Sequence, residues 1–132
     1  MHVEIDRTPV ELCRVRAWVA DVLFHARIGA SLTADVVLVA SELVSNAVEA
    51  AAGGTIEVHL RVRDIVGGRE IVLSVSNSGT WAERADQFTL PHATGPRGRG
   101  LAVCRSLTRH LSLRRIGGRT VATSYFRVLD DA

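Results

Sequence analysis

The chain contains no lysine, and its 16 basic residues are all arginines, set against 14 acidic residues for a net charge of only +2. Because these arginines are scattered along the sequence, we do not predict a nucleic-acid-binding surface. No apolar run reaches the roughly 18 residues that a membrane-spanning helix needs. The N-terminus, MHVEIDR, has none of the features of a signal peptide. We therefore expect a cytoplasmic protein that does not bind membranes.

Cysteine is also scarce, with Cys13 and Cys104 as the only two. Both have apolar neighbours in separate predicted helices, which favours buried, reduced thiols over a disulfide or a metal pair. The histidines show no metal-ligand spacing, and no serine or cysteine stands in a nucleophile elbow. Zinc chemistry and triad chemistry are therefore disfavoured.

A chain of 132 residues, 47% of them hydrophobic, is long enough to form one domain with a single core. Its periodicity predicts, in order, a strand over 2–6, a helix over 9–28 stopped by Gly29, a helix over 36–51, strands over 55–64 and 70–76, a helix over 99–107, and strands over 111–116 and 119–128. Glycine pairs at 67–68 and 117–118 predict hairpin turns. The fold class that follows is an α+β two-layer sandwich, with about three helices on one side of a mostly antiparallel, mixed sheet of about five strands.

The helix predicted over 36–51 carries an unusual polar stripe. Thr33 can cap this helix, and Asp35 places a negative charge in its first turn. The polar side chains fall within an arc of about 140°; they are Asp35, Ser41, Glu42, Ser45, Asn46 and Glu49. None of them is an arginine, although a solvated face in an arginine-rich chain would usually carry both signs. An ordinary amphipathic helix is the alternative interpretation.

Within this stripe, Glu42 and Asn46 have the spacing i, i+4, so their side chains lie one turn apart on the same face. An amide oxygen beside a carboxylate suits a hard cation such as Mg²⁺, and the carboxylate can also accept a proton. The pair is therefore a candidate site for one ligand.

The second informative stretch is GPRGRGL, residues 95–101, just before the third predicted helix. Its glycines permit a close backbone approach, the free N–H groups of the helix start attract anions, and Arg97 and Arg99 add positive charge. A flexible surface loop with solvated arginines is the alternative. The stretch is not a Walker loop, because no GK[ST] follows, and not a Rossmann fingerprint, because no strand immediately precedes it. Residues 77–98 lack periodicity, and so long a loop is usually functional or mobile.

Taken together, the segments ELVSNAVEAA, VSNSG and GRGLAV resemble the GHKL superfamily of ATP-binding domains, which share the Bergerat fold. The small size and the segments SELVSNA and GRGLAVCRSL are most similar to the stand-alone anti-sigma factor serine/threonine kinases of bacteria. The resemblance extends from Thr8 to Phe126. It implies a single histidine-kinase-like ATPase domain over 1–132, with the adenine motif and the ATP lid over 77–98.

The resemblance also implies roles for individual residues, with ATP and Mg²⁺ as cofactors. Glu42 would be the general base and Asn46 the magnesium ligand. Asn77 and Gly79 would belong to the adenine site. The phosphates would bind to the glycine motif and its flanking residues, which are Arg97, Gly98, Arg99, Gly100 and Leu101.

The departures from the family pattern are concentrated in the adenine motif. Asn77 stands where an aspartate is expected, and Trp81 stands where a second glycine is expected. An asparagine keeps one carbonyl acceptor but lacks the negative charge, which should cost about 1 kcal/mol, or roughly fivefold in affinity. Trp81 could crowd the pocket or stack on the base. Ala50 replaces a histidine that is common in the family.

The resemblance implies a kinase that phosphorylates a serine of an anti-anti-sigma (STAS-type) partner and sequesters a sigma factor. Two alternatives stay open: a non-catalytic nucleotide-sensing or protein-binding module, and a detached histidine-kinase-type ATPase domain. Kinases of this type commonly form homodimers. The apolar residues of the first helix extend more than halfway around it, and they include Trp18. We therefore expect a two-fold dimer through the N-terminal segment.

Overall fold

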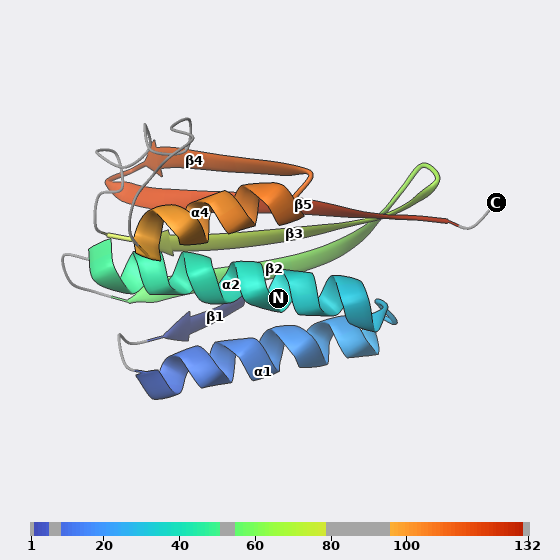
Figure 1. The fold of residues 1–132 in the computed structure, drawn as a ribbon, viewed down its shortest axis with the longest axis horizontal. Helices are drawn as coiled ribbons and strands as arrows, with labels where there is room; N and C mark the ends of the chain where they lie inside the picture. Colours follow the sequence, from blue (N-terminus) through green and yellow to red (C-terminus); the bar gives the residue numbers. More distant parts are fainter. Residues whose placement is uncertain (1, 6–8, 51–54, 79–95, 131–132) are drawn as a thin grey trace.

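The computed structural model describes residues 2–5, 9–50, 55–78 and 96–130. These residues form two layers, with three helices on one face of a five-stranded sheet (Figure 1). The elements are β1 His2–Ile5, α1 Pro9–His25, α2 Ala30–Ala50, β2 Ile56–Ile65, β3 Gly68–Asn77, α4 Pro96–Leu107, β4 His110–Ile116 and β5 Arg119–Leu129. The predicted α+β two-layer sandwich is confirmed.

The strand order in the sheet is β1-β2-β3-β5-β4, and each neighbouring pair of these strands is antiparallel. Two tight turns connect the long strands. Gly67 between β2 and β3 has a φ of 81°, and Gly117 and Gly118 between β4 and β5 have φ of 57° and 79°. Since a positive φ favours glycine, these glycines mark the turns in the sequence as well.

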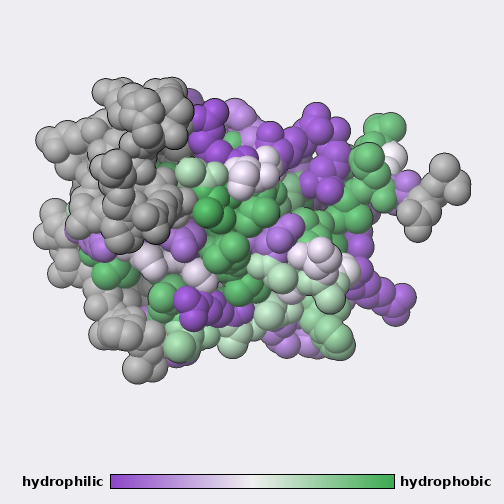
Figure 2. Space-filling model, in the orientation of Figure 1, coloured by the Kyte–Doolittle hydropathy of each residue, from purple (hydrophilic) through white to green (hydrophobic). Residues whose placement is uncertain are grey.

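The core lies between the sheet and α2. The helix-facing side chains of β2 and β3 are at most 1% exposed, and they are Ile56, Val58, Leu60, Ile71, Leu73 and Val75. Helix α2 lies between α1 and α4 in this layer (Figure 1). It is long and apolar enough to cross a membrane by composition, but its buried apolar side chains, among them Val36, Val39 and Leu43, pack into this core. The helical face of the molecule shows apolar surface over α2 and α4, with hydrophilic side chains gathered over β4 (Figure 2).

The boundary between α1 and α2 differs from the prediction. Helix α1 ends at His25, because Arg27 adopts a left-handed φ of 61° and the N–H of Ile28 donates to the carbonyl of Leu23 at 2.9 Å. This is a Schellman motif with an arginine in the position that glycine usually occupies. The predicted stop, Gly29, instead directly precedes α2, and the N–H of Thr33 donates to its carbonyl at 3.0 Å. Thr33 is therefore in the first turn of α2 and is not its cap.

Helix α4 also begins earlier than predicted, at Pro96. Proline suits the first position of a helix because its φ is already helical and its missing N–H would have no acceptor there. The backbone of the glycine motif, from Arg97 to Gly100, consequently belongs to the first turns of α4. The prediction began this helix at Arg99 and so left Arg97 and Gly98 in the preceding loop.

Candidate functional site

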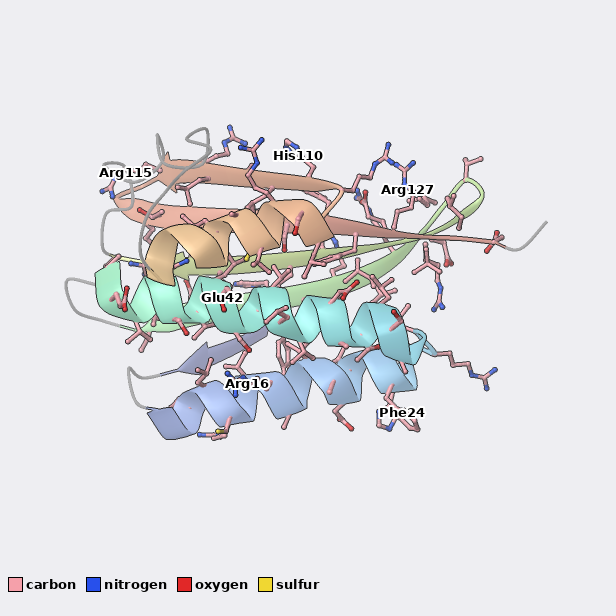
Figure 3. All side chains as sticks on the ribbon, in the orientation of Figure 1. Arg16, Phe24, Glu42, His110, Arg115 and Arg127 are labelled. Carbon is pink, nitrogen blue, oxygen red and sulfur yellow. The ribbon has the colours of Figure 1, made fainter. Side chains whose placement is uncertain are left out.

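Glu42 lies on the side of α2 that faces α4 (Figure 3). A Cβ atom built on Gly100 would lie only 2.3 Å from Oε2 of Glu42 and 3.2 Å from its Cδ. Any residue other than glycine at position 100 would therefore displace the carboxylate. The fold thus brings together the two features that the sequence singled out, the polar stripe of α2 and the glycine motif.

The start of α4 places partial positive charge beside the carboxylate of Glu42. The first backbone N–H groups of an α-helix have no acceptor within the helix, and the helix dipole places positive charge there. In α4 these groups belong to Arg97 and Gly98, because Pro96 has no N–H. Leu101, by contrast, is 3% exposed and is part of the hydrophobic core. Its side chain anchors α4, while the preceding turn can bind an anion.

Asn46 lies one turn beyond Glu42 on α2 and is 5% exposed. Among the described residues, its Nδ2 has no hydrogen-bond partner. An unpaired buried polar group costs about 1–3 kcal/mol, so such a group often serves a ligand. Because a half-turn of the amide exchanges nitrogen and oxygen, Asn46 can present either a donor or a carbonyl acceptor. It therefore fits the predicted role of a magnesium ligand, since Mg²⁺ often takes only one or two protein oxygens and completes its shell with phosphates and water.

Asn77, the last residue of β3, is completely buried. Neither Oδ1 nor Nδ2 of its amide has a hydrogen-bond partner in the described part of the chain. In register with it on β5 is Thr120, whose hydroxyl accepts a hydrogen bond from Nη1 of Arg115 at 3.2 Å. The ends of β3 and α2 and the start of α4 lie at the same end of the molecule, on the left in Figure 1. The amide of Asn77 and Nδ2 of Asn46, which have no partner among the described residues, thus belong to the same end of the domain.

The prediction missed two arginines that hold this region. Nη2 of Arg119 donates to the carbonyl of Ser76 at 3.2 Å and lies 3.3 Å from Oε2 of Glu57, which fixes the end of β3 next to Asn77. Nε of Arg16 on α1 donates to Oγ of Ser41 at 2.7 Å, so a neighbouring helix supplies an arginine to the polar stripe (Figure 3). The contacts of Arg119 join β5 to β2 and β3, whereas the contact of Arg16 joins the consecutive helices α1 and α2. Arg119 is the first residue of β5, two residues before Val121, which pairs with Ser76. No local pattern in the sequence indicates either contact.

The thiol of Cys104 is affected both by its burial and by the charge of Glu42. Burial, and secondarily the negative charge of Glu42, raises the pKa of the Cys104 thiol to about 12. Cys13 is exposed, and both cysteines are free thiols. The prediction of a buried thiol is therefore confirmed for Cys104 and wrong for Cys13. Cys13 lies on the side of α1 away from the core, which Val15 and Val19 face.

Other predicted features fall outside the described residues. These are Gly79, Trp81 and most of the lid, residues 79–95, together with the side chains of Arg97 and Arg99. In the part of the chain that the structure describes, no three His, Cys, Asp or Glu side chains are grouped as a metal site would require. A magnesium ion at Asn46 would therefore depend on oxygens of the nucleotide and of water.

A family model described as the histidine kinase-like ATPase domain matches residues 5–124. Three solved structures are similar. The SiaB–SiaC complex from Pseudomonas aeruginosa matches with a TM-score of 0.66 and 15% identity, over 97% of this chain and 89% of that chain. The RsbU and RsbW domains of Rv1364c from Mycobacterium tuberculosis match with a TM-score of 0.68 and 24% identity, over 100% of this chain and 34% of that chain. The catalytic domain of the histidine kinase ThkA matches with a TM-score of 0.52 and 18% identity, over 96% of this chain and 95% of that chain.

Among curated proteins, no sequence matches this chain significantly. At the identities above, the solved structures show that the fold is shared. The family match extends over nearly the whole chain and includes α2, β3 and α4, which carry the candidate site. The protein therefore belongs to the family of histidine kinase-like ATPase domains.

Proposed function

We propose that this protein is an ATP-dependent serine/threonine kinase of the anti-sigma type, which phosphorylates an anti-anti-sigma partner and sequesters a sigma factor. The observation that carries the proposal is the close approach of Glu42 to Gly100, which places a carboxylate beside the anion-binding turn of α4. The fold similarity to the SiaB–SiaC complex and to the RsbU and RsbW domains supports this choice among histidine kinase-like ATPases.

In this proposal, the nucleotide occupies the end of the domain between α2, α4 and the end of β3. The backbone N–H groups of Arg97 and Gly98 would bind its phosphates, as the start of a helix does for anions, and the side chains of Arg97 and Arg99 would add positive charge. Asn46 would hold Mg²⁺ through its amide oxygen, and Asn77 would pair with the base. When bound, Mg-ATP supplies the γ-phosphoryl group that is transferred, with the metal neutralising the phosphate charge.

Glu42 would accept the proton of the attacking serine hydroxyl. A carboxylate next to a polyphosphate suffers electrostatic repulsion, so a base in this position needs a compensating cation. Asn46 lies one turn away on the same face of α2, where it can hold that cation. Gly100 leaves the carboxylate the space to stand between the two helices.

We also propose that the protein forms a homodimer through its N-terminal helix. Trp18, the residue on which this expectation rested, is partly buried against the core. Phe24 is instead 75% exposed. Beside Phe24, an apolar groove between α1 and α2 is lined by small residues that include Ala17, Ala20 and Ala34. A protruding aromatic side chain next to a groove of small residues suits a self-complementary two-fold interface.

Transfer of radiolabelled phosphate from ATP to a cognate anti-anti-sigma protein tests the proposed kinase activity. Glu42→Gln keeps the shape of the side chain and removes the base, so transfer should fall about 10²- to 10⁴-fold. ATP binding should persist in this variant. Undiminished transfer by Glu42→Gln would exclude Glu42 as the base. Nucleotide binding without transfer to a cognate partner would favour the non-catalytic binding module.

A further inference from the structure

We infer that Asn77 lets the base pocket accept both 6-amino and 6-oxo purine nucleotides, so that this site does not select adenine as a carboxylate would. The inference rests on the proposed nucleotide site, and it concerns which bases that site accepts. It follows from the chemistry of one buried side chain, Asn77, whose two polar atoms have no partner among the described residues.

Asn77 differs from the groups proposed to bind phosphate. It is uncharged, completely buried and located in the sheet layer at the end of β3, whereas the anion-binding turn belongs to α4. A neutral amide with one donor side and one acceptor side matches the neutral edge of a base better than it matches a phosphate. Within the described residues, only Asn46 and Arg119 also have buried side-chain nitrogen or oxygen atoms without a partner. Asn77 is therefore the residue best suited to read the base.

An amide can pair with either kind of purine edge. With a 6-aminopurine, Oδ1 accepts from the amino group and Nδ2 donates to N1. With a 6-oxopurine, the amide turns over, so that Nδ2 donates to the 6-oxygen and Oδ1 accepts from the N1–H. Both arrangements contain two hydrogen bonds, and they differ only by a half-turn of the amide.

No described neighbour fixes that orientation. Both polar atoms of Asn77 lack a partner in the described part of the chain. Arg115 donates to the hydroxyl of Thr120, the residue that pairs with Asn77 across the sheet. Arg119 fixes the backbone at Ser76, so the position of the amide is set while its orientation is not. The ligand itself would select the orientation.

A carboxylate in this position would act differently. It only accepts hydrogen bonds, so it would pair with a 6-amino group and repel a 6-oxygen held in the same place. Leaving a buried polar group unpaired costs about 1–3 kcal/mol, which corresponds to roughly 5- to 150-fold in affinity. Asn77→Asp should therefore create a preference for adenine that the natural residue lacks.

Competition against a fluorescent ATP analogue, with Mg²⁺ present, can measure the affinities for ATP and ITP. ITP carries the 6-oxo group without the 2-amino group of GTP, so the comparison isolates the 6-position. We expect the dissociation constants of ATP and ITP to agree within tenfold for the natural protein. Asn77→Asp should raise the ratio of the ITP constant to the ATP constant by at least about fivefold. Asn77→Leu, which is similar in size but apolar, should weaken both nucleotides and leave the ratio unchanged.

A preference of the natural protein for ATP over ITP of more than tenfold would overturn the inference and leave the proposed kinase function intact. An unchanged ratio in Asn77→Asp would also overturn it. If the fluorescent analogue, ATP and ITP all fail to bind, the proposed function itself fails. Should thermal unfolding show that Asn77→Asp does not fold, the natural protein and Asn77→Leu still decide the question.

Discussion

Replacing Gly100 by alanine should separate catalysis from folding. The new Cβ would lie 2.3 Å from Oε2 of Glu42. Because Leu101 and Cys104 hold α4 in the core, the flexible end of Glu42 must move instead of the helix. To reach an ordinary nonbonded separation of about 3.4 Å, the carboxylate must retreat by about 1 Å.

A displacement of that size at a reacting group can cost about 10²-fold in rate. We therefore expect phosphotransfer by Gly100→Ala to fall by about 10²-fold. Stability should change little, because alanine favours a helix over glycine by about 1 kcal/mol and this gain offsets the rearrangement of Glu42. Single-turnover phosphotransfer and thermal unfolding, measured on the same preparation, separate the two effects.

Two comparisons make this prediction specific. Gly29→Ala is the matched control, since a Cβ there would meet nothing within 4 Å and phosphotransfer should be unaffected. In a Glu42→Ala background, Gly100→Ala should cause no further loss, because the group that it displaces is gone. Full activity of Gly100→Ala, or an equal loss with and without Glu42, would refute the reasoning.

Three other predictions concern the interface, the thiols and the end of β3. Phe24→Glu should convert a dimer to a monomer in light scattering, whereas Val66→Glu, at an exposed turn, should not; a dimer that survives Phe24→Glu places the interface elsewhere. At pH 8 a thiol reagent should modify Cys13 and spare Cys104, whose pKa of about 12 keeps it protonated. A Cys13→Ser protein that reacts readily with the reagent in the folded state at pH 8 would contradict the protection of Cys104. Because the pKa of Cys104 lies above the ordinary value of 9.0, the stability that the neutral thiol contributes should be lost as the pH rises from 9.0 to about 12. Arg119→Met should lower stability by about 1–2 kcal/mol in chemical denaturation, since it removes the donors to Ser76, while Arg61→Met, at an exposed position, should have little effect.

The elements with clear local signals could be predicted from the sequence. Alternating apolar residues in β2 and β3 and the glycines at 67 and 117–118 reflect the pleat and the positive φ of the turns, which are properties of the local chain. The end of α1 could not be predicted in this way. Arg27 takes a left-handed conformation there, and Arg69 of β3 donates to the carbonyls of Ala26 and Arg27. A contact with a distant strand thus helps to hold the end of this helix.

The candidate site, too, could be predicted from the sequence only where its residues belong to one element. The i, i+4 spacing of Glu42 and Asn46 is visible in the sequence because both belong to one helix. The proximity of Glu42 to Gly100 depends on how α2 packs on α4, and no local pattern encodes that packing. Arg16 acts across a helix pair in the same way. The roles of the glycine motif came from the family resemblance, and the structure adds the steric reason for glycine at position 100.

Calorimetric titration with ATP, in the presence of Mg²⁺ and again after its removal with EDTA, tests the central claim that the space between α2, α4 and the end of β3 binds Mg-ATP. The natural protein should bind one nucleotide per chain, and the affinity should fall at least tenfold without Mg²⁺. Asn46→Leu should bind more weakly and lose the dependence on Mg²⁺, because its side chain offers the metal no oxygen. The absence of any binding heat and thermal shift, or a magnesium dependence that Asn46→Leu leaves unchanged, would contradict this account.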